Sequence, residues 1–250
     1  MSVSACAELV QRGDPDRFRA VMAAPVEARA QLLPLYAFNL EVARAPWVTQ
    51  EPLIAEMRLQ WWRDVVENAA SGAARAHEVA GPLHDLIRDF GLPVDVMDRL
   101  IAARRWDVHR DPHEGVDGLS AYLEDTGAGL MWLAARALGA PDAAEAPVRA
   151  YGWASAAAMY ICAIPVLEER GRHPLPDKVS AQDLAWQGLE KLTIARNSRK
   201  TIPKEVAPAL LAGWQTEGLL RQMVAGHTSP ALSEARKRWD LLRQAFTGRW

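Results

Sequence analysis

Apolar side chains recur at the spacing of a helix face along most of this chain. In the segment that begins at Pro52, apolar residues hold one set of positions and charged residues hold most of the others, until Ser71-Gly72 ends the pattern. The same spacing predicts further helices at about 26–46, 82–90, 93–110, 119–138, 143–167, 180–198, 203–225 and 229–246. Strict alternation of polar and apolar residues does not stand out, so we expect almost no sheet.

Helix beginnings and short connections favour one all-α domain. The pairs Asp14-Pro15, Glu51-Pro52 and Gly81-Pro82 place proline where a helix begins. The polar or proline-rich stretches at 71–77, 111–118 and 168–177 do not resemble flexible linkers. The 72 Ala and Leu residues outnumber the 32 Val, Ile and Thr residues, which also favours helices over sheets. We therefore predict a single domain over 1–250.

Charge and cysteine content describe an ordinary protein of a reducing compartment. The 29 basic and 31 acidic residues leave a net charge of −2, unlike that of a dedicated nucleic-acid binder. Cys6 and Cys162 cannot build a disulfide framework or a four-thiolate zinc site, and Cys162 is expected to be inert. The N-terminus lacks the basic start of a signal peptide, so we expect the cytoplasm. The uncharged run 150–167 is interpreted as a buried central helix rather than a transmembrane helix.

Two pairs of carboxylates four residues apart are candidate magnesium ligands, because such pairs share one helix face. Asp85 and Asp89 lie in an amphipathic helix, and Asp107 and Asp111 lie where Pro112 ends a helix. We expect both pairs to be exposed. A compact group of possible metal ligands surrounds the second pair, but Pro112 breaks the helix, and no metal site is predicted from Asp107, His109, Asp111, His113 and Glu114.

Tryptophans and one basic run are the remaining concentrated features. The ten tryptophans lie mostly on apolar helix positions, where filling the core is a commoner role than lining a cavity for a long apolar ligand. The basic run is a solvated surface or a contact for an acidic partner or anionic lipid, and it comprises Lys191, Arg196, Arg199, Lys200 and Lys204.

Four stretches together resemble the squalene/phytoene synthase family. Residues 35–42 read L-Y-A-F-N-L-E-V, like the L-Y-A-F-C-R-x-V helix of that family, and 57–64 read M-R-L-Q-W-W-R-D at a similar interval. Residues 151–154 open a helix like the second motif helix of the family, and 170–176 read R-G-R-H-P-L-P, like R-G-R-x-Y-L-P. The likeness covers about 26–180. It implies an all-α isoprenoid-synthase fold with a central cavity.

The resemblance also implies that the aspartates of the active family are missing. Those aspartates hold Mg²⁺ ions that bind and ionise an allylic diphosphate. At the first motif this chain has Ala43, Arg44 and Trp47, and at the second it has Ala163 and Leu167. Further motif positions also differ, namely Leu40, Ala156, Met159, Cys162 and Pro174. The resemblance therefore predicts no catalytic residue and no metal or cofactor, and Mg²⁺ is expected only if the chain is active after all.

The chain is most similar to the branch of this family that lacks the metal motifs, a branch that includes a complex I assembly factor. That likeness implies a non-catalytic protein that acts by binding, with a protein partner at a respiratory membrane and a peripheral place on its inner face. The alternatives are an active head-to-head prenyltransferase and a non-catalytic module that holds an isoprenoid or other lipid. The candidate anion- or partner-binding residues are Arg170, Arg172, Arg196, Arg199 and Lys200.

Overall fold

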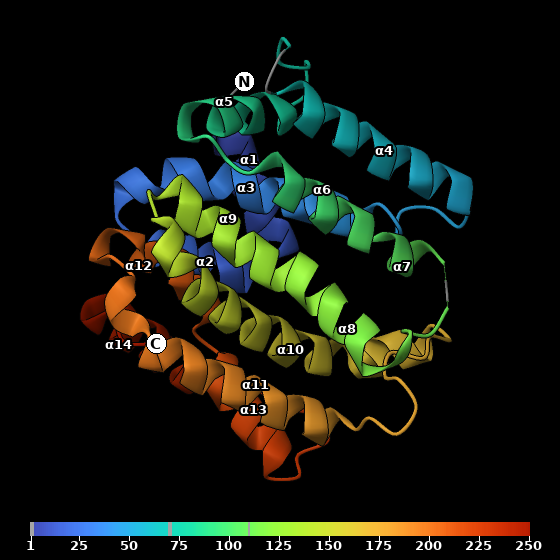
Figure 1. The fold of residues 1–250 in the computed structure, drawn as a ribbon, viewed down its shortest axis with the longest axis vertical. Coiled ribbons are helices and arrows are strands. Elements are labelled where there is room, and N and C mark those ends of the chain that lie inside the picture. Colours follow the sequence, from blue (N-terminus) through green and yellow to red (C-terminus); the bar gives the residue numbers. More distant parts are fainter. Residues whose placement is uncertain (1–2, 70–71, 110) are drawn as a thin grey trace.

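The helix α10, Glu145–Glu169, runs through the middle of the molecule (Figure 1). It packs against α9 (Gly129–Ala137) and the π-turn η1 (Glu124–Ala128) on one side, and against α11 (Ala181–Asn197) and α13 (Thr216–Val224) on the other. By length and composition α10 is the one helix of the described residues that could cross a membrane, and half of its apolar window is buried inside the fold. The packing agrees with the predicted buried central helix.

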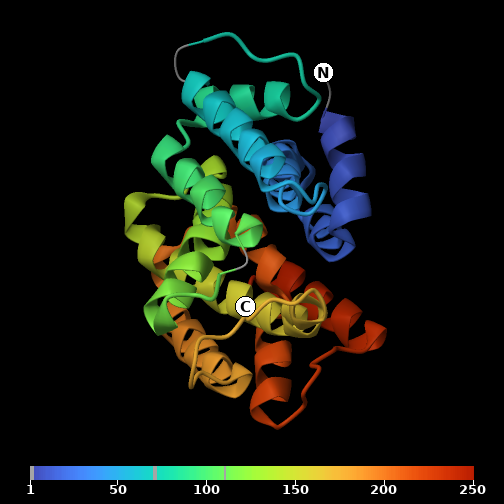
Figure 2. The same ribbon diagram turned by 90° about the vertical axis from the view of Figure 1, so that its right-hand side faces the viewer.

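This is a computed structural model, and it describes residues 3–69, 72–109 and 111–250. No strand occurs in that part of the chain, so the predicted all-α class is confirmed. Figure 2 shows the N-terminal helices at one end and the C-terminal helices at the other. The remaining elements are α1 (Val3–Gly13), α2 (Pro15–Ala23), α3 (Val26–Arg44), α4 (Pro52–Asn68), α5 (Ala80–Phe90), α6 (Val94–Ala103), α7 (Arg105–Val108), α8 (Gly115–Leu123), η2 (Asp142–Ala144), η3 (Arg199–Thr201), η4 (Lys204–Val206), α12 (Ala207–Leu210), η5 (Leu211–Gly213) and α14 (Glu234–Thr247).

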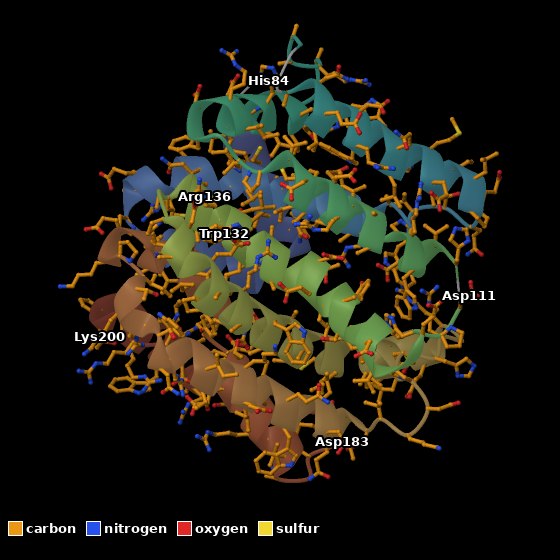
Figure 3. All side chains as sticks on the ribbon, in the orientation of Figure 1. His84, Asp111, Trp132, Arg136, Asp183 and Lys200 are labelled. Carbon is orange, nitrogen blue, oxygen red and sulfur yellow. The ribbon has the colours of Figure 1, made fainter. Side chains whose placement is uncertain are left out.

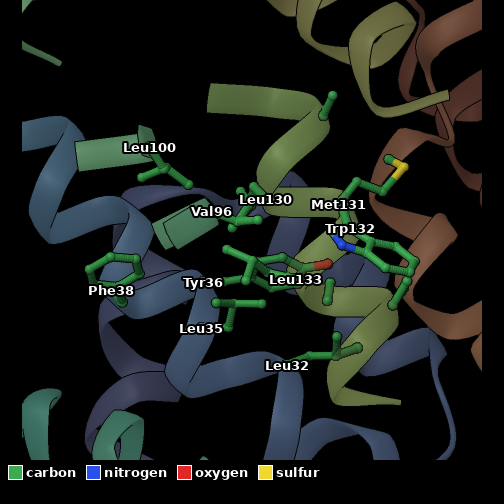
Figure 4. Close-up of a cluster of buried hydrophobic side chains, with 14 of the residues drawn as sticks. Leu32, Leu35, Tyr36, Phe38, Val96, Leu100, Leu130, Met131, Trp132 and Leu133 are labelled. Atoms are coloured by element: carbon green, nitrogen blue, oxygen red, sulfur yellow. The ribbon is translucent and has the colours of Figure 1, made fainter. Parts of the chain in front are cut away.

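Buried apolar side chains of the described residues form one continuous cluster from Cys6 to Trp250. In Figure 4, side chains from α3, including Tyr36 and Phe38, meet side chains from α6 and α9, including Leu100 and Leu133. Phe38 is fully buried and contacts the Trp62 ring edge-on, with the ring centroids 5.4 Å apart. The predicted core role is confirmed for the five buried tryptophans and is wrong for three that are exposed, namely Trp47, Trp186 and Trp239.

Several helix ends match their local signals. Asp14 caps α2, because its carboxylate accepts the Arg17 N–H at 2.9 Å. Ser180 and Asp183 form a reciprocal capping box at the start of α11. The helix predicted at 82–90 begins two residues earlier, because the ring of His77 accepts the N–H of Ala80 ahead of the proline. The predicted ends at Ser71 and at residue 110 lie outside the described residues.

One helix was missed, and four predicted helices differ from the structure. The helix α1 was not predicted, and 93–110 is interrupted after Ala103. The stretch 119–138 belongs to a segment that begins at Gly115 and contains a π-turn, where a Cβ at Gly127 would lie 2.2 Å from Ala156 Cβ. The helix predicted at 203–225 is broken between Leu210 and Thr216, where the Tyr151 ring packs on Gly213. The helix α14 begins only after Ser233, which caps it.

Candidate functional site

A cavity of about 310 Å³ lies between α3, the segment from α7 to α9, and α10. Three positions that the family motifs assign to metal-binding aspartates line it here as Trp47, Ala163 and Leu167. The remaining two lie elsewhere, since Arg44 is exposed and lines a separate surface pocket and Ala43 is half-buried. The motif wall of the cavity is therefore apolar.

Magnesium does not fit this cavity. Asp107 is the sole carboxylate among the described lining residues, and the lining also includes the guanidinium groups of Arg17 and Arg104. No three His, Cys, Asp or Glu side chains among the described residues come together as a metal site. Mg²⁺ needs carboxylate oxygens in near-octahedral array, and two cations beside one acid repel it. We therefore derive no reaction step through magnesium.

Asp107 is buried, so the expectation that it lies exposed on the surface is wrong. It is 6% exposed and accepts a hydrogen bond from the Tyr122 hydroxyl at 2.9 Å. Arg104 donates to the same hydroxyl oxygen at 2.8 Å and to Asp107 at 3.4 Å. Burial raises the pKa of Asp107, and the charge of Arg104 and the Tyr122 hydroxyl oppose that rise. The carboxylate of Asp107 is therefore occupied by partners from the protein itself.

Arg172 enters the same cluster because of how α10 ends. Gly171 adopts φ 70, and the N–H groups of Gly171 and Arg172 bond the carbonyls of Glu168 and Leu167, which is a Schellman motif. The turn directs Arg172 inward, where its guanidinium donates to the carbonyls of Trp106 and Asp107. Arg172 is only 4% exposed, so this candidate anion-binding residue serves the protein's own backbone.

Tryptophan rings cover both arginines of the loop after α10. The guanidinium carbon of Arg172 lies 4.4 Å from the Trp106 ring centroid and 5.8 Å from that of Trp47. Arg170, which is exposed, lies 4.7 Å from the Trp47 ring centroid. Where the family motif places an aspartate, an indole thus contacts two cations directly.

His113 belongs to the buried cluster and not to a metal site. Its ring stacks on Trp106 at 4.0 Å, and its Nε2 lies 3.0 Å from the Tyr160 hydroxyl, which itself donates to the Pro174 carbonyl. Burial and Arg172 lower the pKa of His113 to about 4. The possible metal ligands around it are dispersed, because His109 contacts Glu56 at 2.8 Å on the surface and Asp111 is exposed (Figure 3).

A larger, more polar cavity of about 730 Å³ adjoins the first and shares Trp47 and Asp107 with it. Arg170, Arg172 and His109 also line it. Asp111 lines it as well, so its charged groups are of both signs. The two cavities together present a mostly apolar chamber beside a polar one, and such a pair accommodates an apolar molecule with a polar end.

The basic run is partly consumed by internal contacts. Arg196 pairs with Glu217 at 2.7 Å and donates to the Trp250 carbonyl at 2.8 Å, and Arg199 donates to the same carbonyl at 3.0 Å. The hydrogen bond from Arg196 lowers the pKa of Glu217 to about 2. Lys200 is exposed (Figure 3). Two of the three candidate residues in this run therefore hold the C-terminal segment in place.

The other predicted residues lie where the sequence placed them. Asp85 and Asp89 are exposed on α5, as expected for a solvated acidic face. The thiol of Cys162 lies 3.6 Å from the Pro230 carbonyl, and burial raises its pKa, which disfavours the nucleophilic thiolate. Sequence reasoning missed Tyr122 and Tyr160. The one local signal for this buried cluster was the spacing of Arg104 and Asp107, which are i, i+3 neighbours.

Known proteins resemble this chain in amino-acid sequence. A sequence model of the squalene/phytoene synthase family matches residues 10–237. Curated relatives include proteins named NADH dehydrogenase (ubiquinone) complex I, assembly factor 6. The Rattus norvegicus protein is 25% identical over 241 residues and the Homo sapiens protein 24%, each match covering 87% of this chain and 72% of the relative. A Drosophila melanogaster homolog is 32% identical over 135 residues, covering 51% of this chain and 40% of the relative.

Solved structures share the fold at low sequence identity. A dehydrosqualene synthase in complex with ligand superposes with a TM-score of 0.80 at 12% identity, covering 98% of this chain and 95% of that one. The squalene synthase HpnC from Alicyclobacillus acidocaldarius superposes with a TM-score of 0.75 at 16% identity, covering 92% and 95%. At these identities the likeness describes the fold.

Proposed function

Because this chain belongs to the squalene/phytoene synthase family, we propose that it is a non-catalytic member that acts by binding in the assembly of respiratory complex I. The observation that carries the proposal is the cavity without free carboxylates. Ionising an allylic diphosphate requires stabilisation of the leaving group's charge, which in this family falls to carboxylate-held Mg²⁺. Here the three motif positions that line the cavity are apolar, and Asp107 is held by Arg104 and Tyr122.

The names of the relatives support the choice of partner. The proteins named complex I, assembly factor 6 match over most of this chain and most of their own length. A retained fold with no metal-binding set acts through surfaces and not through chemistry. We place the protein at the inner face of the respiratory membrane, as a peripheral protein bound to a protein partner there.

The first test is genetic. Deleting the gene is expected to lower assembled complex I and NADH-dependent respiration in isolated membranes, and a plasmid copy is expected to restore both. Pools of C30 and C40 isoprenoids should not change. If deletion instead depletes one of those isoprenoids and leaves NADH-dependent respiration intact, the protein is a prenyltransferase and the proposal is wrong.

The second test is enzymatic. The purified protein, incubated with farnesyl or geranylgeranyl diphosphate, Mg²⁺ and NADPH, should yield no C30 or C40 product. Any product that survives repurification contradicts the proposal. The variant Asp107→Asn then separates the possible explanations, because an activity that depends on the cavity carboxylate disappears in this variant while a contaminating synthase persists.

A second candidate function is lipid binding in the cavity without turnover. Three residues that line the cavity each carry a buried polar atom without a hydrogen-bond partner, namely Arg17 Nη1, Asn39 Oδ1 and Arg104 Nε. A polar head group satisfies such atoms while an apolar tail contacts Ala163 and Leu167. Farnesol is a suitable probe. In equilibrium dialysis, Ala163→Phe should abolish its binding, and the control Val166→Phe, at an exposed position of the same helix, should leave it unchanged.

A further inference from the structure

Helix α14 presents an apolar stripe to solvent. Trp239, Leu242 and Phe246 are 62%, 50% and 83% exposed, and their spacing of three and four residues places them on one helix face. The opposite face is anchored to the fold, where Asp240 and Gln244 are buried and Gln244 donates to the Leu210 carbonyl at 2.9 Å. The stripe therefore faces outward on a fixed helix.

Uncompensated arginines flank that stripe. Arg238, Arg243 and Arg249 are exposed, and their side chains make no hydrogen bond or ion pair with the described residues. The stretch 234–250 holds five basic residues and two acidic ones in a chain whose net charge is −2. Its two acids are already paired, since Asp240 contacts Arg236 at 2.7 Å and Glu234 contacts Arg19 at 3.3 Å.

The basic run of the sequence adds to the same surface. Arg199 bonds the Trp250 carbonyl at the end of the segment that follows α14, which places the neighbouring Lys200 beside that end of the molecule. Positive charge thus continues past the apolar stripe, and the one acid within its span, Asp240, is buried and paired with Arg236.

We propose that this face of α14 docks on an anionic lipid bilayer, with the apolar stripe in the boundary between head groups and acyl chains. Tryptophan, phenylalanine and leucine on one face with arginine beside them is the composition of interfacial helices. The arginines meet lipid phosphates, and each adds to the attraction near an anionic surface. The proposal names the membrane-facing surface for the peripheral location proposed above, and in that respect it rests on the proposed function.

Charge distinguishes this face from the exposed apolar positions of α4. There Leu53 and Met57 are 72% and 64% exposed, but α4 carries three acidic residues, Glu56, Asp64 and Glu67, against the two arginines Arg58 and Arg63. Carboxylates near an anionic surface are repelled. The α4 face is therefore a matched comparison for the lipid-binding experiment.

The experiment uses the purified full chain and two kinds of vesicle, phosphatidylcholine alone and phosphatidylcholine mixed with phosphatidylglycerol. Co-sedimentation should be stronger with the anionic vesicles and should weaken in ~0.5 M salt, where screening is nearly complete beyond a few ångströms. The variant R238E/R243E should weaken binding at least about tenfold. The control R58E/R88E changes the net charge equally on exposed arginines elsewhere and should bind like the wild type.

A second pair of variants tests the apolar contribution. The variant W239S/F246S should lose binding that persists at high salt, and the control L53S/M57S should keep it. Far-ultraviolet spectra establish that all four variants remain folded, since the substituted side chains are exposed. If the wild type sediments equally with both vesicles, or if both members of a pair lose binding alike, the proposal is wrong.

A failure here is distinguishable from a failure of the proposed function, because no respiratory component is present in the vesicle experiment. A chain that ignores anionic vesicles yet still supports complex I in the deletion test docks through a protein contact, and then α14 is not a lipid surface. A chain that binds the vesicles but does not affect complex I keeps the lipid surface and loses the assembly role.

Discussion

The two walls of the central cavity differ in the charged groups that they contain. On the wall built from α3 and α10, the family's acidic positions hold Trp47, Ala163 and Leu167, and no carboxylate remains there. On the wall built from α7 and α8, Asp107 stays buried among donors from Arg104 and Tyr122, next to Arg172. The motif positions of the first wall are apolar, and the second wall is a polar network in which the Asp107 carboxylate is paired.

The difference teaches that the motif positions and the paired ion cluster follow different rules. Carboxylates that face a bound cation lose their partner when the cation is no longer held, and apolar replacements then avoid burying an unpaired charge. Removal of a carboxylate that is paired within the protein costs more free energy, because the partner's charge is then left buried and unpaired. On the polar wall, we therefore expect a substitution to lower the free energy of unfolding more when the replaced group is more buried. On the apolar wall, we expect the loss to depend on the shape of the new side chain.

The largest effect is expected on the polar wall at Arg172. Arg172→Met removes the donors to the carbonyls of Trp106 and Asp107 and leaves buried acceptors unpaired, so the free energy of unfolding should fall by about 2–4 kcal/mol. Urea denaturation followed by tryptophan fluorescence measures it. The matched change Arg170→Met removes an exposed guanidinium and should cost less than about 1 kcal/mol. Equal losses in the two variants would mean that burial does not distinguish these arginines.

A comparable loss of stability is expected at the apolar wall, where it arises from a steric clash. A Cβ at Gly127 would lie 2.2 Å from the Cβ of Ala156, so Gly127→Ala must push η1 away from α10 at a cost of about 2–3 kcal/mol. At Gly129 the nearest atom is Val96 Cγ1 at 3.4 Å, and Gly129→Ala should change stability by less than about 1 kcal/mol. The same denaturation experiment measures both variants, and a stable Gly127→Ala protein would refute the close contact.

A smaller effect is expected from pH. Burial and Arg172 hold the pKa of His113 at about 4, below the ordinary value of 6.5. The unfolded chain therefore gains a proton first as the pH falls, so this contribution is complete above pH ~6.5 and is lost toward pH ~4. The variant His113→Gln should show a shallower dependence of unfolding free energy on pH over that interval. An unchanged slope would show that His113 does not titrate as the buried ring requires.

The smallest expected effect is that of magnesium on the apolar wall. The melting temperature should shift by less than about 1 °C in millimolar Mg²⁺ with inorganic pyrophosphate, because a ligand stabilises a fold only if the fold binds it. A saturable, magnesium-dependent rise would locate a cation site that Asp107 and its neighbours do not provide. Calorimetry with and without chelator measures the shift.

The sequence alone predicted the helical class, most helix positions and the absence of acids from the motif positions. These features are local, since helix periodicity, capping residues and motif spacing extend over only a few residues. The exposed pair Asp85 and Asp89 was predicted for the same reason, because the apolar face of its own helix fixes where the acids point. The likeness to a family supplied the central cavity.

Only the tertiary structure decided which charged groups are buried and which are free. The backbone carbonyl of Asp107 accepts from the guanidinium of Arg172 65 residues away, His113 meets Tyr160 across 47 residues, and Arg196 binds the carbonyl of Trp250 across 54. Nothing near Arg172 or Arg196 in the chain encodes those partners. The same holds for Arg238 and Arg243 of α14, because the acids near them already pair with Arg236 and Arg19. Pairing is settled by chain packing in space, because a charge lowers its energy through whichever group the fold brings within a few ångströms.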